Sequence, residues 1–349
     1  MSASVTKLLT AILFGLFVFS SACYATEIRL VVNDGPGEGF NDTSAGFDGQ
    51  TGNPGVTLGE QRLNVFQAAA DYWEERIISD VPIRVGIQFN ALFCSSFSAT
   101  LGSAGPRGIF RDFPNAPKPN VWFVGAVADS LTGSDLQSTR PDIEATFNSD
   151  IDNNNNCLIG TNWWLGIDSP APSNTISLFD TVLHEIGHGL GVLSLVSQTG
   201  VLNGGRQDAY SYHLFDAETD TFWRDMDDAE REDSAINNGN LVWRGPNADA
   251  NSDHIVAGKT NGHIRIYAPN PYQPGSSVSH WDTSLQPDEL MEPSATPTSD
   301  DRSTIQLVKD VGWRIVEGPG AIGFVTSAAS VEENDGTVVL QVSLSLIHI

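Results

Sequence analysis

The sequence predicts an α+β fold, on the basis of two observations. A helical pattern at 58–78 is followed by three β-rich segments, at 81–89, 121–128 and 143–149, and a second helical pattern begins near Ser177. Apolar residues make up 40% of the 349-residue chain, which also contains eight Trp; this composition indicates a substantial core rather than a disordered chain.

The first helix is expected over 58–78. Thr57 and Glu60 form a capping box at its start, in which each side chain accepts a hydrogen bond from the other residue's backbone N–H. Apolar residues then recur at helical spacing, and this predicts that one face of the helix packs on a core: Leu63, Phe66, Ala70, Trp73 and Ile77.

Three segments are expected to be strands. The first, 81–89, alternates apolar and polar residues, and 121–128 is a second β-rich run. The third, 143–149, is more polar, which predicts an edge strand on which an extended peptide could pair. The stretch 94–118 is rich in Gly, Pro and Ser and is expected to be a loop.

The second helix carries the main motif. Ser177 and Asp180 resemble a capping box, and an apolar stripe predicts a buried face: Leu178, Val182, Ile186 and Leu190. On this helix His184, Glu185 and His188 form the pattern HExxH, which places both imidazoles on one face, one turn apart. Two imidazoles with a carboxylate that reaches a water molecule are the donor set of a zinc hydrolase.

Three glycines, Gly187, Gly189 and Gly191, lie within or directly after this motif. Each costs a helix up to about 1 kcal/mol relative to Ala, so local propensity does not explain them. Close packing around a metal and a sharp exit from the helix at Gly191 would explain them.

A catalytic zinc needs a third protein ligand. In the compact motif HExxHxxGxxH the third His lies three residues after the Gly, but Ser194 occupies that position here and is a poor zinc ligand. The other candidates in the chain are four histidines or a carboxylate: His213, His254, His263 and His280, or Asp216 or Glu218.

Two blocks of the sequence together resemble leishmanolysin-like metzincins, a family of zinc endopeptidases in which the third His follows an insertion. They are the helix HEIGHGLG and a later stretch with His280-Trp281 and Glu289-Leu290-Met291. The resemblance implies three Zn²⁺ ligands, His184, His188 and His280. It also implies that Glu185 is the catalytic base, that Met291 forms the Met-turn beneath the metal, and that Gly191 turns the chain below the site.

The same resemblance implies the architecture of the catalytic domain, which is expected to span 26–317. It should contain a twisted mixed sheet, the active-site helix and a C-terminal subdomain with the Met-turn. Residues 195–275 or so are expected to form a loop-rich insertion. The chain departs from the family in two ways: Val192 replaces an aromatic residue, and the dense cysteine framework is missing.

Two features indicate further stabilising sites. Cys94 and Cys157 are the two cysteines that follow the signal segment, and in an oxidising compartment they are expected to form a disulfide. Residues 148–157 carry oxygen ligands at alternating positions, as calcium loops do: Asp150, Asp152, Asn154 and Asn156. The segment lacks the Gly and distant Glu of an EF-hand, so a plain polar turn is the alternative to a Ca²⁺ site.

The two ends of the chain are expected to lie outside the catalytic domain. Residues 1–25 contain the apolar run LLTAILFGLFVF and are expected to be a signal peptide, which makes the protein secreted. Residues 318–349 are expected to form a linker and the truncated start of a β-domain that resembles a Calx-beta repeat. The last six, 344–349, match what a sequencing adaptor would encode and are expected to be an artefact.

Charge and hydropathy exclude two classes of partner. A formal net charge of −25 argues against a nucleic-acid partner, because binding phosphates requires a basic face. No apolar run after the signal segment is long enough for stable membrane insertion. The predicted function is therefore a secreted zinc endopeptidase acting on a protein or peptide substrate. Two alternatives stay open: a zinc peptidase with an acidic third ligand, and an extracellular adhesion or matrix protein whose protease-like domain is catalytically degenerate.

Overall fold

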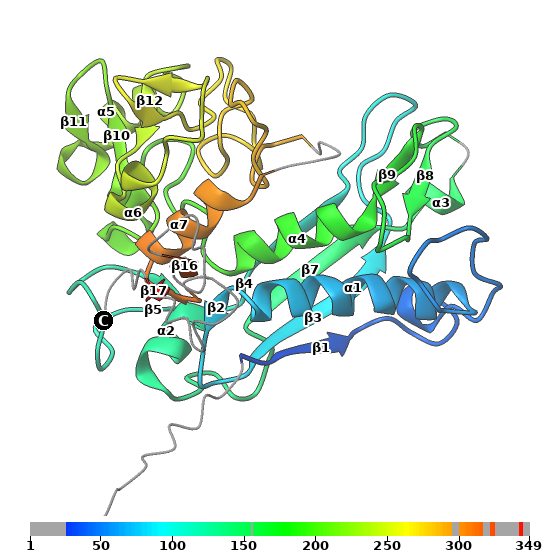
Figure 1. Ribbon diagram of the computed structural model, residues 1–349. Coiled ribbons are helices and arrows are strands. Elements are labelled where there is room, and N and C mark those ends of the chain that lie inside the picture. The colour runs from blue at the N-terminus through cyan, green and yellow to red at the C-terminus, as the bar shows by residue number, and fades with distance from the viewer. Residues whose placement is uncertain (1–25, 155, 295–299, 317–321, 325–341, 345–349) are drawn as a thin grey trace, which may run out of the picture.

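The computed structural model describes residues 26–154, 156–294, 300–316, 322–324 and 342–344 (Figure 1). The predicted signal peptide at 1–25 and the final residues 345–349 lie outside the described residues, as does most of the predicted β-domain start. Within the described part of the chain, no helix combines the length and apolarity needed to cross a membrane.

A four-stranded mixed sheet forms the base of the molecule. Its strands lie in the order β1 (Ile28–Val32), β3 (Ile83–Asn90), β7 (Ile143–Asn148) and β4 (Gly102–Pro106). β3 pairs in parallel with both β1 and β7, whereas β4 pairs antiparallel with β7. The prediction that 143–149 is an edge strand is therefore wrong, since β7 has a partner on each side; the edge on that side of the sheet is β4.

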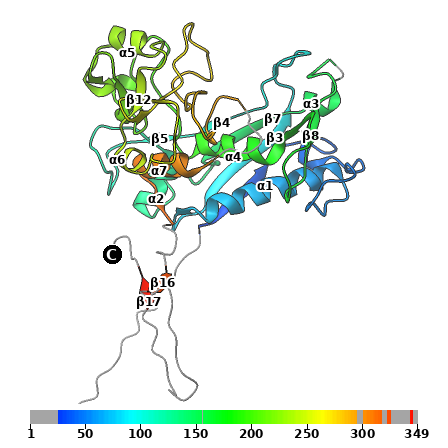
Figure 2. The same ribbon diagram turned by 45° about the horizontal axis from the view of Figure 1, so that its top comes forward.

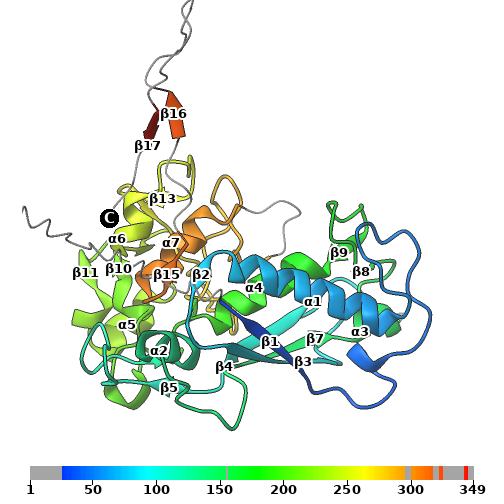
Figure 3. The same cartoon turned by 60° about the horizontal axis from the view of Figure 1, so that its bottom comes forward.

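Two helices, α1 (Leu58–Glu74) and α4 (Leu178–Gly189), lie along one face of this sheet and pack on each other (Figures 1 and 3). The predicted capping box of α1 is confirmed, with both hydrogen bonds present between Thr57 and Glu60. The Trp73 indole N–H of α1 donates to the Leu183 carbonyl of α4 at 3.2 Å. Phe66 of α1 packs edge-to-face on Phe147 of β7, with ring centroids 4.7 Å apart. These contacts fix α4 against both the sheet and α1.

The second half of the chain forms a lobe beside the C-terminal end of α4 (Figures 1 and 2). Its centre is a small antiparallel sheet in the order β11 (Thr221–Phe222), β10 (Leu214–Asp216) and β12 (Leu241–Trp243). The predicted insertion at about 195–275 thus contains short regular elements, with the buried indoles of Trp223 and Trp243 in its core.

The remaining elements are short. The helices are α2 (Gly125–Thr132), α3 (Asp150–Asn153), α5 (Asp228–Ser234), α6 (Pro246–Ala250) and α7 (Arg302–Asp310), with 3-10 turns at Gly39–Asn41, Asn203–Gly205, Ser211–His213 and Trp223–Asp225. The strands form five pairs: β2 (Ile77–Ile78) with β15 (Arg314–Ile315), β5 (Ile109–Phe110) with β6 (Phe123–Val124), β8 (Asn162–Trp164) with β9 (Thr175–Ser177), β13 (Lys259–Thr260) with β14 (His263–Ile264), and β16 (Ile322–Phe324) with β17 (Val342–Leu344).

Two local predictions are corrected. Residues 121–128 contain only the two-residue strand β6, after which α2 begins at Gly125; a short apolar run does not distinguish a strand from a buried helix. The expected loop at 94–118 contains β4 and β5. The coarse prediction of an α+β fold is confirmed by the mixture of helices and small sheets.

Candidate metal centre

Three imidazoles from two distant segments meet above the sheet. His184 and His188 lie one turn apart on α4, and His280 comes from the loop that follows β14. Their Nε2 atoms form a triangle in which each side measures 3.1 Å. The structure therefore brings together the three residues that the resemblance assigns to zinc.

Each of these histidines is oriented through its other nitrogen. The Nδ1 atoms contact backbone carbonyls, at 2.9 Å for His184 and Leu290, and at 2.7 Å for His280 and Ser276. The third pair, His188 Nδ1 and the Val192 carbonyl, is also 2.7 Å apart. Because a carbonyl oxygen only accepts, each Nδ1 must carry the proton, and each Nε2 is left with a lone pair.

Three lone pairs that converge without a proton between them repel one another, and a cation at their centre would relieve that repulsion. In a tetrahedral zinc site with Zn–N of about 2.0–2.1 Å, the nitrogens lie about 3.3 Å apart, close to the observed spacing. Burial lowers the pKa of His184 to about 3, with a further contribution from His188, and burial also lowers the pKa values of His188 and His280. The imidazoles are therefore neutral at physiological pH, as ligation requires. The donor set and its spacing fit a zinc ion.

The Glu185 side chain lies against the edge strand β4. Glu185 is 7% exposed, and the nearby backbone N–H of Ala104 acts to lower the pKa of its carboxyl group. Burial raises its pKa to about 8; a bound divalent cation would lower that pKa and favour the carboxylate. Gly102 provides the space, because a Cβ there would lie 2.9 Å from Glu185 Cγ.

The glycines of the motif have separate structural roles. A Cβ on Gly187 would lie 2.6 Å from Met291 Sδ, and one on Gly189 would lie 2.4 Å from Ile143 Cγ2. Gly187 therefore admits the buried Met291 side chain against the helix, and Gly189 lets α4 approach β7. Gly191 adopts a φ of 111°, which an L side chain rarely adopts. The turn that it makes returns the Val192 carbonyl to His188.

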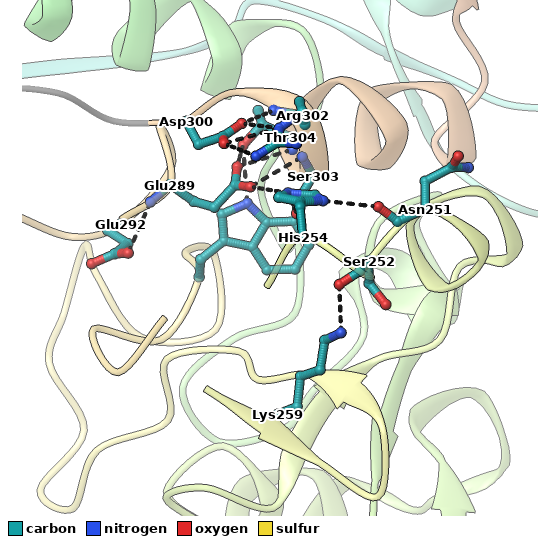
Figure 4. Close-up of polar contacts among 11 residues, drawn as sticks. Asn251, Ser252, His254, Lys259, Glu289, Glu292, Asp300, Arg302, Ser303 and Thr304 are labelled. Atoms are coloured by element: carbon teal, nitrogen blue, oxygen red, sulfur yellow. Dashed lines mark hydrogen bonds and ion pairs between the residues drawn. The ribbon is translucent and has the colours of Figure 1, made fainter. Parts of the chain in front are cut away.

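The loop that carries Leu290 and Met291 is anchored to the start of α7 (Figure 4). The buried Glu289 carboxylate accepts backbone hydrogen bonds from Ser303 at 3.1 Å and from Thr304 at 3.4 Å. A carboxylate is favourable at that helix end because it meets unpaired N–H groups and the positive end of the helix dipole. His254 lies 3.1 Å from the same carboxylate. This anchor positions the Leu290 carbonyl that orients His184.

Other predicted residues lie away from the three histidines. The expected disulfide is confirmed: Cys94 and Cys157 are bonded and close a 63-residue separation. Asp216 accepts backbone hydrogen bonds from Glu218 and Thr219, and the Asn237 amide also donates to it, at 2.9 Å. The carboxylate alternatives, Asp216 and Glu218, thus belong to the small sheet of the second lobe, and the third position beside His184 and His188 is taken by His280.

The predicted calcium segment is held by protein contacts. Asp152 pairs with the buried Arg62 guanidinium at 3.2 Å and accepts the Trp163 N–H at 3.1 Å. The Asn154 amide donates to Asp150, and the Asn156 backbone N–H donates to Asn154. These bonds describe a polar turn at the end of β7. Calcium binding by this segment stays a prediction.

Several parts of the site could not be read from the sequence. The three carbonyls that orient the histidines belong to Leu290, Val192 and Ser276, and a backbone group leaves no side-chain signal. Gly102 lies in a segment whose composition predicts a loop, so the sequence does not indicate its contact with Glu185.

Searches against protein-family models, curated proteins and solved structures found no match to this chain.

Proposed function

We propose that the chain is a secreted zinc endopeptidase with a leishmanolysin-like metzincin catalytic domain. The observation that carries the proposal is the triangle of three Nε2 atoms with the Glu185 carboxylate adjacent on the same helix. When bound, zinc supplies a Lewis acid that acidifies a water molecule and polarises a carbonyl group. The three histidines would hold it, and their Nδ1–H bonds to carbonyls keep them in the ligating tautomer.

Glu185 acts as the general base and then as the general acid. Its carboxylate accepts the proton of the attacking water and afterwards donates it to the leaving amine of the cleaved peptide bond. Its packing against Gly102, with the Ala104 N–H nearby, places the carboxylate beside β4. Because the carboxylate is already held in place, the entropic cost of positioning a base does not add to the activation free energy.

The substrate would lie in an extended conformation along β4. In the described sheet β4 pairs only with β7, so its other edge is available to a peptide backbone. The contact between Gly102 of β4 and Glu185 places that edge next to the proton-transferring carboxylate. The predicted pairing of substrate with 143–149 is thereby moved to the neighbouring strand.

Replacing Glu185 with Gln tests the catalytic role. The variant should retain one zinc per chain and lose at least about a hundredfold in kcat on casein or on a peptide library, because Gln accepts no proton. His184→Ala, His188→Ala and His280→Ala should lose zinc itself, measured by mass spectrometry, whereas Asp216→Ala and Glu218→Ala should retain it. Normal cleavage by the Glu185→Gln variant would reject the general-base role. A wild-type, zinc-loaded chain that cleaves no peptide would favour the adhesion or matrix alternative.

A further inference from the structure

A second group of carboxylates, separate from the three histidines, lies between α2 and the start of β7. Asp129 is in the second half of α2, and Asp135 and Asp142 belong to the loop that leads into β7. One oxygen from each lies within 4.8 Å of the others. Asp129 and Asp142 are 3% and 1% exposed, whereas Asp135 reaches the surface.

Two of the buried oxygens in this cluster have no hydrogen-bond partner among the described residues. Asp129 accepts the Leu136 N–H through Oδ1 at 2.9 Å, and Asp142 accepts the Arg84 N–H through Oδ2 at 2.8 Å. The other oxygen of each, Asp129 Oδ2 and Asp142 Oδ1, is buried and unpaired. An unpaired buried carboxylate oxygen is strongly unfavourable, and two in one cluster call for either a compensating cation or a proton shared between Asp129 and Asp142.

The charges of the surrounding groups indicate what is missing. The Arg84 guanidinium lies 3.0 Å from Asp135 and balances one of the three carboxylates. Its other contacts are to the backbone carbonyls of Gln137 and Ser138. The Arg84 charge also acts to lower the pKa of Asp142, which burial raises. With all three carboxylates ionised, the cluster and Arg84 together keep a net of two negative charges. Burial, with the charges of Asp142 and Asp135, raises the pKa of Asp129 to about 7, which shows how poorly the protein groups alone stabilise a second carboxylate there.

We propose that Asp129, Asp135 and Asp142 form a calcium site, separate from the three histidines. All of the donors are oxygens, which suits a hard cation, and Ca²⁺ accepts the irregular geometry of a loop with water completing its six to eight ligands. A divalent ion matches the two uncompensated charges. Asp135 at the surface gives the ion a path of entry.

The position of the site gives it a structural consequence. Val127 on α2, two residues before Asp129, lies near the Cβ positions of Gly191 and Gly312, at 4.0 and 3.1 Å. Asp142 directly precedes β7, which pairs with the strand that contacts Glu185. Calcium would therefore hold together two elements that support the exit of α4 and the edge strand.

Calcium binding is measured on the full, zinc-loaded chain in buffer stripped of calcium. Equilibrium dialysis against ⁴⁵Ca²⁺ should show saturable binding that Asp129→Asn and Asp142→Asn each weaken at least tenfold. Asp150→Asn is the matched control, since it removes one carboxylate from the other acidic segment, and it should bind as the wild type does. For a dissociation constant of about 0.1 mM, about 10 mM CaCl₂ should raise the wild-type Tm by about 5 °C and leave that of Asp142→Asn unchanged.

The competing explanation is a proton shared between Asp129 and Asp142, and the same variants separate the two. With calcium, the order of Tm should be wild type above Asp142→Asn; without calcium the order should reverse, because Asn removes the repulsion. The proposal is overturned if the wild-type chain shows no saturable calcium binding, or if binding survives in both Asn variants. A wild-type Tm that ignores calcium but falls as pH rises through about 7, in a manner abolished by Asp129→Asn, would assign the pair to a shared proton instead.

Discussion

The contact between Gly187 and Met291 makes a prediction whose sign opposes that of helix propensity. Gly187→Ala in an isolated helix should stabilise by about 1 kcal/mol. In this protein the new Cβ would lie 2.6 Å from Met291 Sδ, a side chain with 0% exposure that has little room to move. Overpacking of this kind costs about 1–3 kcal/mol, so the net expectation is a destabilisation of about 1 kcal/mol.

A double-mutant cycle isolates that contact. Met291→Ala alone should destabilise by about 2–5 kcal/mol through the cavity it leaves. In that background Gly187→Ala no longer meets the sulfur and should stabilise by about 1 kcal/mol, which gives a coupling of about 2 kcal/mol between the two sites. Urea unfolding of the four zinc-loaded proteins measures each term. A Gly187→Ala variant that is more stable than the wild type, or equal effects of the substitution in both backgrounds, would refute the packing of Met291 beneath α4.

Three further experiments with substituted chains test other parts of the structure. Gly102→Ala places a Cβ 2.9 Å from Glu185 Cγ and should lower kcat at least about tenfold with zinc content unchanged. Gly105→Ala on the same strand meets no atom of the described residues within 4 Å and should leave kcat near the wild-type value. Equal rates in the two variants would contradict the contact between Gly102 and Glu185. Replacing both Cys94 and Cys157 with Ser should lower the free energy of unfolding by about 4 kcal/mol, measured by urea titration, since the disulfide spans a separation of 63 residues. Burial, together with neighbouring carboxylates, raises the pKa of Glu292 to about 7, above the unfolded value of about 4.3. Glu292 therefore contributes stability that is fully present below about pH 4.3 and is lost as the pH rises to about 7. Glu292→Gln should remove this part of the pH dependence when the free energy of unfolding is measured at several pH values.

Sequence reasoning succeeded where the determining signal is local. The capping box of Thr57 and Glu60 and the apolar stripe of α1 depend on residues a few positions apart, and the helix forms as expected, although it ends at Glu74, four residues before the predicted end. The start of α4 follows Ser177 in the same way, with the Ser177 side chain accepting the Asp180 N–H. The disulfide followed from the presence of two cysteines after the signal segment and from the oxidising compartment that this segment implies.

Sequence reasoning failed where pairing between distant segments decides the structure. β4 is built from the sequence GSAGP, whose composition is typical of a loop, and it becomes a strand because β7 supplies its hydrogen bonds. The run beginning at Val121 looked like a strand, yet Gly125 starts a helix that packs beside the exit of α4.

The identification of His280 as the third ligand depends on both local and distant features of the sequence. The spacing of the HExxH motif places Ser194 where a third zinc ligand would be expected, and it leaves several other residues as candidates for that ligand. Only the resemblance to leishmanolysin-like metzincins selects His280 among them. In the structure the loop from 276 to 291 carries His280 together with the carbonyl that orients His184 and the methionine under Gly187. The choice of ligand is thus a property of that whole loop, which no single residue pattern encodes.

The most direct test of the account is anomalous diffraction at the zinc absorption edge from crystals of the zinc-loaded chain. The account predicts one strong peak about 2.0–2.1 Å from the Nε2 atoms of His184, His188 and His280, with Glu185 beside the peak but not bound to it. A peak bound by Asp216 or Glu218 in place of His280, or the absence of any peak between the three imidazoles, would contradict it.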